Sequence, residues 1–162
     1  MCKFMNKIIS PQSLLDSNTH DFTFVSGVFD LLHPGHLHML HKAKNEVPEH
    51  KLVVAAINDA DVRERKGPGR PVYNLAERSD ALSYLADVDF VIPWEEPWQK
   101  LREFVLKLKP KILVVVEGDP GTVNKREIIE TVHGRLVELP REPGYSTTEL
   151  IRKIRELQDA QL

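Results

Sequence analysis

Short apolar runs alternate with amphipathic segments along most of this chain. The continuous apolar runs at residues 52–57 and 112–116 are typical of strands that are covered on both faces of a sheet. Shorter runs of the same character predict strands at residues 22–26, 88–92 and 136–139. The segments between these runs predict helices near residues 35–45, 75–85, 96–108, 124–133 and 147–158.

Strands and helices that alternate through short connections form a parallel sheet, because right-handed crossovers lay the helices against its faces. We therefore predict an α/β protein of the doubly wound, Rossmann-like type, with a five-stranded parallel sheet and helices on both faces. A length of 162 residues suits one domain. Residues 1–20 form a polar leader outside the alternation, in which Ser10-Pro11 is expected to open a short helix, and residues 21–162 form the single domain.

Local signals mark several boundaries of the predicted elements. A capping side chain precedes an acid by three residues in three places: Asn74 with Glu77, Asn124 with Glu127, and Ser146 with Glu149. Gly134 follows the fourth predicted helix, where a left-handed cap is wanted. Residues 59–73, rich in charge, Gly and Pro, are predicted to form a loop after the second strand. Because ligands bind beyond the carboxyl ends of parallel strands, this basic loop is expected on the ligand-binding edge.

Composition narrows the classes of protein that fit. The chain is 41% hydrophobic and 28% charged, an ordinary globular balance, and no apolar stretch is long enough for a membrane span. The first residues lack a secretory signal, and Cys2 is the single cysteine, so we expect a cytoplasmic protein without an internal disulfide. A net charge of −2 argues against binding to nucleic acid over a broad basic face. A polyanionic ligand must therefore be held by a local group of residues.

The turn after the first strand has the features of an anion site. Its sequence is Gly27-Val28-Phe29-Asp30-Leu31-Leu32-His33-Pro34-Gly35-His36. Gly27 allows a tight turn close to a ligand, and Pro34 suits the first position of a helix. Gly35 lets a phosphate approach the helix N-terminus, where N–H groups are free and the helix dipole is positive. His33 and His36, three residues apart across the helix start, are both able to donate hydrogen bonds to phosphate oxygens.

This string resembles the signature of the cytidylyltransferase-like nucleotidyltransferases, whose mark is His-x-Gly-His, and the match with a strand before it is highly specific. The resemblance implies that His33 and His36 stabilise a triphosphate during attack on its α-phosphorus. It also implies that neighbouring residues of the turn contact the nucleotide: Gly27, Val28, Phe29, Asp30 and Gly35. The competing interpretation is that the histidines only decorate the start of a helix.

The basic loop contains Arg65-Lys66-Gly67-Pro68-Gly69-Arg70-Pro71-Val72. We interpret it as a lid in which Lys66 closes over the β- and γ-phosphates, where charge builds as pyrophosphate leaves. The sequence is similar to the Lys-Gly-x-Gly-Arg-Pro-Val of bacterial heptose-1-phosphate adenylyltransferases, which is followed by an arginine in the next helix, here Arg78. Glycerol-3-phosphate cytidylyltransferases place lysines and an arginine likewise. The alternatives are a solvated loop and, for Arg78, a buried structural ion pair.

Two later segments are expected to complete the nucleotide site. One is similar to the Arg-x-x-Gly-x-Ser-Thr-Thr of cytidylyltransferases and the Gly-x-Ser-Thr-Thr of the heptose enzymes, which implies triphosphate contacts from Arg141, Ser146, Thr147 and Thr148. Ser146 is also expected to cap its helix. The other follows the fourth strand, where family members hold the base and ribose, and implies contacts from Gly118 and Asp119. Val116 and Pro120 replace the lysine and the aromatic residue usual in the heptose enzymes, which leaves the base preference open.

We therefore expect a nucleotidyltransferase that uses ATP or CTP, with Mg²⁺ carried by the triphosphate, and a small phosphorylated sugar or polyol as acceptor. A sugar 1-phosphate with ATP is the first choice, and glycerol 3-phosphate with CTP the second. A module that binds nucleotide without catalysis is an alternative of a different class. The resemblance allows a homodimer, and we expect no nucleic-acid or membrane partner.

Three other interpretations are weaker. His38 and His41 lie three residues apart, but no third metal ligand is evident, so we expect no metal site of the protein's own. An aminoacyl-tRNA synthetase fragment shares the histidine signature, yet this chain lacks a Lys-Met-Ser-Lys-Ser-like loop and a basic RNA-binding face. A flavodoxin-like domain does not fit, because its phosphate loop usually offers Ser and Thr where this turn has histidines.

Overall fold

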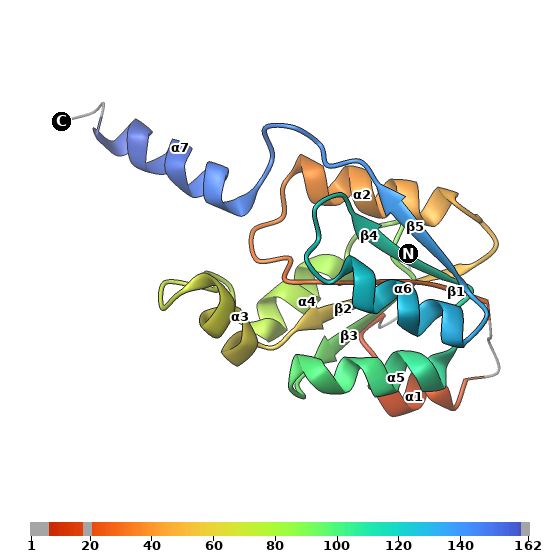
Figure 1. Cartoon of the computed structure of the whole chain (residues 1–162). Coiled ribbons are helices and arrows are strands. Elements are labelled where there is room, and N and C mark those ends of the chain that lie inside the picture. The colour runs from red at the N-terminus through yellow and green to blue at the C-terminus, as the bar shows by residue number, and fades with distance from the viewer. Residues whose placement is uncertain (1–6, 18–20, 160–162) are drawn as a thin grey trace, which may run out of the picture.

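The computed structural model describes residues 7–17 and 21–159 and contains one parallel sheet (Figure 1). Its five strands lie in the order β3-β2-β1-β4-β5, and every neighbouring pair is parallel. The strands are β1 (Phe22–Gly27), β2 (Lys51–Ile57), β3 (Phe90–Trp94), β4 (Ile112–Val116) and β5 (Arg135–Leu139). The predicted fold class is confirmed, and the third strand begins two residues later than expected because Val88 lies in the turn that follows a helix.

Helices cover both faces of this sheet. The helices are α1 (Pro11–Leu15), α2 (Pro34–Asn45), α3 (Asp59–Lys66), α4 (Leu75–Ser83), α5 (Leu101–Leu108) with the short 3₁₀ turn η1 (Trp98–Lys100) before it, α6 (Thr122–Thr131) and α7 (Thr147–Asp159). Buried side chains of α2 and α4 pack on one face, and those of α1, α5 and α6 pack on the other. The helix α7 extends away from the sheet, and none of its described residues is buried (Figure 1).

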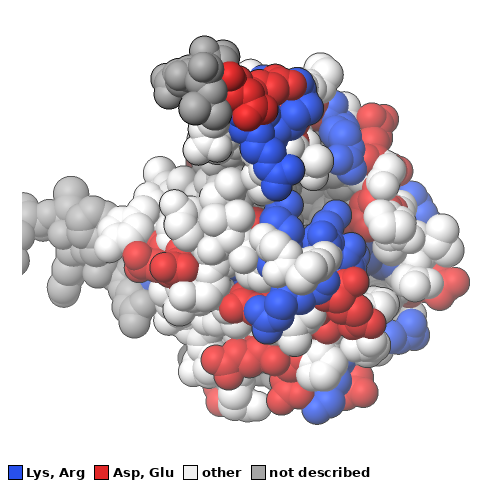
Figure 2. Space-filling model, turned by 90° about the vertical axis from the view of Figure 1, so that its left-hand side faces the viewer, with Lys and Arg blue, Asp and Glu red and all other residues white. Residues whose placement is uncertain are grey.

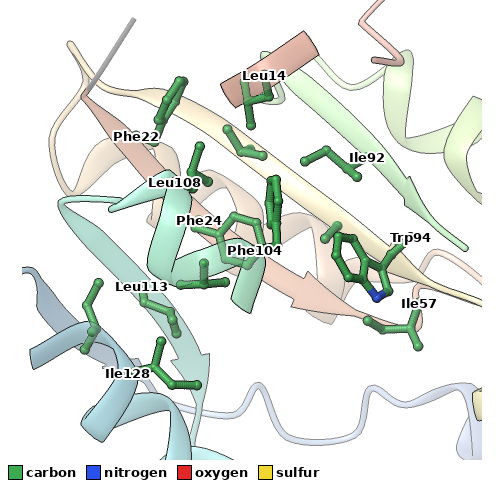
Figure 3. Close-up of a cluster of buried hydrophobic side chains, with 14 of the residues drawn as sticks. Leu14, Phe22, Phe24, Ile57, Ile92, Trp94, Phe104, Leu108, Leu113 and Ile128 are labelled. Atoms are coloured by element: carbon green, nitrogen blue, oxygen red, sulfur yellow. The ribbon is translucent and has the colours of Figure 1, made fainter. Parts of the chain in front are cut away.

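The apolar run of β2 explains why the core has two halves. Side chains alternate between the faces of a strand, so Val53 and Ala55 enter one cluster while Leu52 and Val54 enter the other. All four residues are fully buried. Figure 3 shows the first cluster, in which Phe104 lies with Phe24 and Trp94, its ring centroid 6.2 and 5.3 Å from theirs. A central parallel strand therefore has to be apolar along its whole length.

The prediction that residues 59–73 form a loop is wrong for their first half, which is the helix α3. Asn58 caps this helix by accepting a hydrogen bond from the Asp61 amide at 2.9 Å. The Asp61 carboxylate in turn accepts from the Trp98 amide at 2.7 Å and so ties α3 to the segment after β3. Only Val62 and Asp61 are buried in this helix, so its sequence shows no amphipathic period.

The capping predictions have mixed outcomes. Asn74 and Glu77 form the expected capping box, and Ser146 accepts a hydrogen bond from the Glu149 amide at 3.0 Å. The prediction for Asn124 is wrong, because α6 begins at Thr122 and this asparagine lies within the helix.

The left-handed cap after α6 falls one residue earlier than Gly134. His133 has a φ of 58°, whereas Gly134 is required for packing. A Cβ at Gly134 would lie 2.5 Å from Ile129 Cδ1 and 2.6 Å from the Pro110 carbonyl oxygen, both closer than atoms can approach.

The described part of the leader packs against the sheet. Ser10 caps α1 through the Ser13 amide, which confirms the short helix expected at Ser10-Pro11. The Ile9 amide donates to the Val91 carbonyl at 3.0 Å, and Leu14 is only 1% exposed in the core. The expectations for Cys2 and for residues 18–20 lie outside the described residues.

Candidate active site

The strand order reverses between β1 and β4, and a cleft of about 290 Å³ opens beyond the carboxyl ends of these strands. Ligands of open parallel sheets bind at this kind of position. Twelve of the fifteen residues predicted for the site line the cleft: Gly27, Val28, Phe29, Asp30, His33, Gly35, His36, Lys66, Arg141, Ser146, Thr147 and Thr148. The structure therefore brings together three segments that are far apart in the sequence: residues 27–36, Lys66, and residues 141–148.

The turn after β1 has an unusual backbone that shapes one wall of this cleft. Phe29 adopts a φ of 51°, a left-handed conformation that side chains rarely take, and it is buried. Its ring lies against His36, with centroids 5.3 Å apart. A Cβ at Gly27 would lie 2.9 Å from this ring, so Gly27 is needed for packing inside the turn. Gly27 and Phe29 together hold the start of α2 close to the end of β1.

Gly35 is required at the start of α2 because of its neighbours in the protein. A Cβ there would meet the Tyr145 Cβ at 3.0 Å and the His33 Nδ1 at 3.1 Å. The absence of a side chain thus lets the β5–α7 connection and the His33 ring approach the same turn. The phosphate access expected from the sequence stays a prediction.

His33 caps the helix α2 with its own ring. Its Nδ1 accepts a hydrogen bond from the His36 amide at 3.4 Å. A neutral imidazole has one donor nitrogen and one acceptor nitrogen, so an accepting Nδ1 assigns the proton of neutral His33 to Nε2. This nitrogen is therefore the one able to donate to an anion.

The two imidazoles stack with ring centroids 3.8 Å apart and an interplanar angle of 19°. Burial, and then the neighbouring His33, lower the pKa of His36 to about 4 from 6.5. Burial also lowers the pKa of His33. The Nδ1 of His36 is buried without a hydrogen-bond partner among the described residues. Both rings are therefore neutral at physiological pH in the free protein.

A second helix begins at the same cleft. The first residues of α7, Thr147 and Thr148, line it together with the capping residue Ser146. The start of α2 lines the same cleft through Gly35 and His36. Each helix N-terminus presents N–H groups and the positive end of a helix dipole. Two such ends at one cleft favour a ligand with several negative charges.

Basic side chains add to this positive potential. Lys66 is exposed at the last position of α3, and Arg141 donates a hydrogen bond from Nε to the Glu117 carbonyl at 3.3 Å. Figure 2 shows the face from which α3 and α7 project; Lys and Arg gather across its middle, and Asp and Glu lie mostly below them. The basic groups are therefore concentrated locally although the whole chain has a net charge of −2.

Three residues predicted to contact nucleotide do not line the cleft. Arg78 is 1% exposed, and its guanidinium donates to the Val28 and Ile57 carbonyls at 2.5 and 2.6 Å. It also forms an ion pair with Asp59 at 2.7 Å, as in the structural interpretation of this residue. The other two are Gly118 and Asp119, and Asp119 accepts from Lys125 at 2.6 Å. Nucleotide contacts by these three residues stay predictions.

Several residues that were not predicted for the site also line the cleft. Arg70 belongs to the basic loop, and Glu142 and Tyr145 belong to the segment before α7. The Glu142 carboxylate accepts from Lys42 at 2.6 Å, which lowers the pKa of that carboxyl group. Their motifs were visible in the sequence, but their orientation toward the cleft depends on how the connections fold.

Within residues 7–17 and 21–159, no three His, Cys, Asp or Glu side chains gather closely enough to hold a metal ion. None of the helices described is both long and apolar enough to cross a membrane.

Comparisons with known proteins bear on the same region. The model of a family described as cytidylyltransferase-like matches residues 24–153. The bifunctional protein HldE of Coxiella burnetii is 34% identical over 155 residues, covering 91% of this chain and 32% of that protein. The HldE protein of Paramagnetospirillum magneticum is 40% identical over 134 residues, covering 81% and 26%. The chain thus spans a third or less of the length of these curated relatives.

Solved structures share the fold. A lipopolysaccharide core biosynthesis protein from Thermoplasma volcanium superposes with a TM-score of 0.60 at 23% identity, covering 75% of this chain and 96% of that one. A pantothenate synthetase from Thermus thermophilus superposes with a TM-score of 0.57 at 15% identity, covering 83% and 61%. At such identities the likeness is one of architecture.

Proposed function

Because this chain belongs to the cytidylyltransferase-like family, and is on that ground a nucleotidyltransferase, we propose that it transfers a nucleoside monophosphate from a nucleoside triphosphate to a small phosphorylated sugar or polyol, releasing pyrophosphate. One observation supports this reaction above others. Two helix N-termini, two stacked imidazoles and the cation Lys66 meet in one cleft at the switch point of the sheet.

The reaction is a direct in-line displacement at the α-phosphorus. A phosphate oxygen of the acceptor forms the new P–O bond as the bond to the β-phosphate oxygen breaks, and pyrophosphate takes the electron pair. The attacking phosphate oxygen is already an anion near neutral pH, so no protein nucleophile is needed. Catalysis then comes from positioning the reactants and from stabilising the charge that moves onto the leaving group.

Each group of the cleft has a role in that scheme. His33 donates from Nε2 to an oxygen of the α-phosphate, and His36 contacts the same phosphate from the adjacent turn of α2. Lys66 and the start of α7 hold the outer phosphates, where negative charge accumulates. Arg141 contacts the triphosphate from the β5–α7 connection. The neutral imidazoles donate without the cost of keeping buried charges before the ligand arrives.

Magnesium enters this proposal as part of the nucleotide substrate. The carboxylates of the cleft are Asp30, which is bound to Arg70, and Glu142, which is bound to Lys42. Neither carboxylate is available as a dedicated ligand of the ion, so the triphosphate oxygens hold the magnesium ion. The ion would neutralise part of the negative charge of the triphosphate.

ATP and a sugar 1-phosphate are the first pair of substrates that we propose. The resemblance of the basic loop to heptose-1-phosphate adenylyltransferases and the similarity to the HldE proteins both favour this pair. A CTP-dependent transfer to a polyol phosphate is the second candidate, because Arg141 lines the cleft and the arginine is a feature of the cytidylyltransferase motif.

A pyrophosphate-release assay tests the proposal directly. ATP, CTP, GTP and UTP are each combined with a panel of sugar and polyol phosphates in the presence of Mg²⁺. Release that depends on both a nucleotide and an acceptor supports the proposed reaction and identifies the pair. Binding of nucleotide without release in any combination would instead establish a nucleotide-binding module.

We expect His36→Gln to lower turnover by a factor on the order of 10²–10³, as for other donors that stabilise transition-state charge. The glutamine keeps a polar side chain of similar size, so the variant should fold. Steady-state kinetics with the identified pair measure the effect, and the melting temperature reports on folding. Turnover close to that of the wild type would remove His36 from the mechanism.

A further inference from the structure

The basic loop also contains Arg70, whose side chain is held in place by a hydrogen bond, whereas Lys66 is exposed. We propose that Arg70, oriented by the buried carboxylate of Asp30, binds the outer phosphates of the nucleotide and of the leaving pyrophosphate. This inference rests on the proposed function for the identity of the ligand. It assigns Asp30, expected from the sequence to touch nucleotide, the role of positioning residue.

Asp30 is an anchor for the second half of the basic loop. Its side chain is fully buried, and one carboxylate oxygen accepts from the Val72 and Tyr73 amides at 2.8 and 3.0 Å. The other oxygen accepts from the Nε of Arg70 at 2.5 Å. A buried carboxylate needs this number of donors, because an unpaired charge would be costly to desolvate. Its lone pairs are committed to the loop, which argues against a direct contact with an anionic ligand.

Arg70 is held by one edge of its guanidinium, which leaves the rest of the group for a ligand. Neither Nη atom has a hydrogen-bond partner in the part of the chain that the structure describes, so four of the five N–H donors stay unsatisfied by protein. The side chain is 13% exposed and lines the cleft. An arginine fixed at Nε presents its two Nη groups as a fork that matches two phosphate oxygens.

The position of Arg70 favours the outer phosphates over the base or ribose. A second cavity of about 540 Å³ lies between residues 66–70 and α7. Lys66, Arg70 and Thr148 line both this cavity and the first cleft. These three residues therefore stand at the junction of the two, next to the start of α7. Lysine, arginine and a helix N-terminus converging at one junction are the groups that bind pyrophosphate.

Arg78 also helps to hold the segment from Arg70 to Tyr73 in place. Its Nε donates to the Tyr73 carbonyl at 3.0 Å, while Asp30 binds the amide of that residue. The stretch from Arg70 to Tyr73 is thus fixed to the turn after β1 on two sides. By contrast, a Cβ placed at Gly67 or Gly69 would touch nothing within 4 Å. The loop has an anchored half, which positions Arg70, and an open half next to Lys66.

Pyrophosphate binding by the full chain, measured by calorimetry with Mg²⁺, tests this assignment without requiring turnover. We expect Arg70→Ala to weaken pyrophosphate binding by about tenfold or more, the size of a charge-assisted contact, and to change nucleoside monophosphate binding by less than about twofold. Arg135→Ala is the matched control, since this exposed arginine pairs with Glu46 at the far end of β5. It removes the same charge and should leave both affinities unchanged.

Asp30→Asn tests the orienting role. Its amide oxygen can still accept from the two loop amides, but its NH₂ group would face the donor Nε of Arg70. We expect this variant to weaken pyrophosphate binding as Arg70→Ala does, and the double variant to bind no more weakly than Arg70→Ala alone. If Asp30→Asn weakened binding only by loosening the fold, the effects of the two substitutions on pyrophosphate binding would add.

The outcomes separate this inference from the proposed function. If the wild type binds pyrophosphate and Arg70→Ala binds it with an affinity within about twofold of the wild type, the inference is wrong and the proposed function still stands. Additive effects of the two substitutions overturn the role of Asp30. A wild-type protein that binds neither pyrophosphate nor any nucleoside triphosphate overturns the function and the inference together.

Discussion

The two histidines of the cleft lie side by side but are held differently. His33 is fixed by a hydrogen bond from the His36 amide, and its ring belongs to the helix cap. The His36 ring is held by packing, between the His33 ring on one side and Phe29 on the other. This packing leaves the Nδ1 of His36 buried without a hydrogen-bond partner among the described residues, and the burial lowers the pKa of the ring.

The stability of the free protein should depend on pH through His36. Its pKa in the folded protein is about 4, whereas it is 6.5 when unperturbed. Between these values the unfolded chain binds a proton that the folded protein does not, so the free energy of unfolding falls as the pH is lowered. At about pH 5 this loss is on the order of 2 kcal/mol relative to neutral pH.

Denaturant unfolding of the wild type and of His36→Gln at neutral pH and at about pH 5 measures this contribution. The wild type should lose more stability than the variant, because glutamine does not titrate. Other acidic groups affect both proteins equally. Parallel stability curves for the two proteins would contradict the depressed pKa.

At this scale the sequence identified the chemistry of single residues better than their positions. The string from Gly27 to His36 was enough to predict a cluster at the end of β1, because those residues are neighbours in the chain. The positions of the arginine side chains were harder to predict. Arg70 and Arg78 both follow Lys66 closely in the sequence, but Arg70 lines the cleft and Arg78 is buried. Which of them faces the cleft depends on contacts with β1 and β2, which are distant in sequence.

At the scale of elements, helix starts are the parts that build the site. The starts of α2 and α7 both face the cleft, and α4 begins at the end of the anchored half of the basic loop. The capping box of α4 satisfies its first amides through Asn74 and Glu77. This cap therefore stabilises the helix that contains Arg78 and limits where the basic loop can end.

Asn74→Ala should lower the free energy of unfolding by about 1 kcal/mol, the usual cost of losing an N-cap. Asn124→Ala is a matched control of the same chemistry, because this asparagine is exposed within α6 and caps nothing. Its effect should stay within about 0.5 kcal/mol. Equal losses for the two variants, measured by denaturant unfolding, would show that the capping box contributes nothing.

The helices that were predicted well are those with an apolar face or a capping box. The helix α3 was missed because a mostly charged segment shows no period, although Asn58 and Asp61 provided a cap. Its place is fixed by tertiary contacts, such as the hydrogen bond from the Trp98 amide to Asp61. Contacts between segments so far apart are not visible in a local pattern.

At the scale of the whole molecule, the core includes residues from the predicted leader. Leu14 packs in the same cluster as Phe24, Phe104 and Leu108 (Figure 3). The Ile9 amide extends the hydrogen bonding of β3 at the edge of the sheet. This segment therefore covers one sheet face together with α5.

Leu14→Ala should lower the free energy of unfolding by about 2–5 kcal/mol, the usual cost of a cavity in a close-packed core. Leu157→Ala is the control, since this leucine is 67% exposed on α7 and should change stability by less than about 0.5 kcal/mol. Chemical denaturation of both variants measures the difference. A small effect of Leu14→Ala would mean that the leader is peripheral to the fold.

The alternation of strands and helices was sufficient to predict a parallel sheet, but it did not determine the order of the strands. That order arises because β1 pairs with both β2 and β4, which places the switch point between β1 and β4. Both neighbours are apolar and β-branched, so their sequences alone do not rank the pairings. The location of the cleft follows from this order.

The ring of His33 at the cap of α2 has a consequence for what this position tolerates. Serine and aspartate are stronger caps than imidazole, and a protein selected only for helix stability would use one of them. The helix instead begins on a weaker cap, whose Nε2 has the donating role that we propose above. Under the proposed function, some helix stability is exchanged for a phosphate donor, and His33→Ser separates the two, because serine keeps a cap and removes the imidazole.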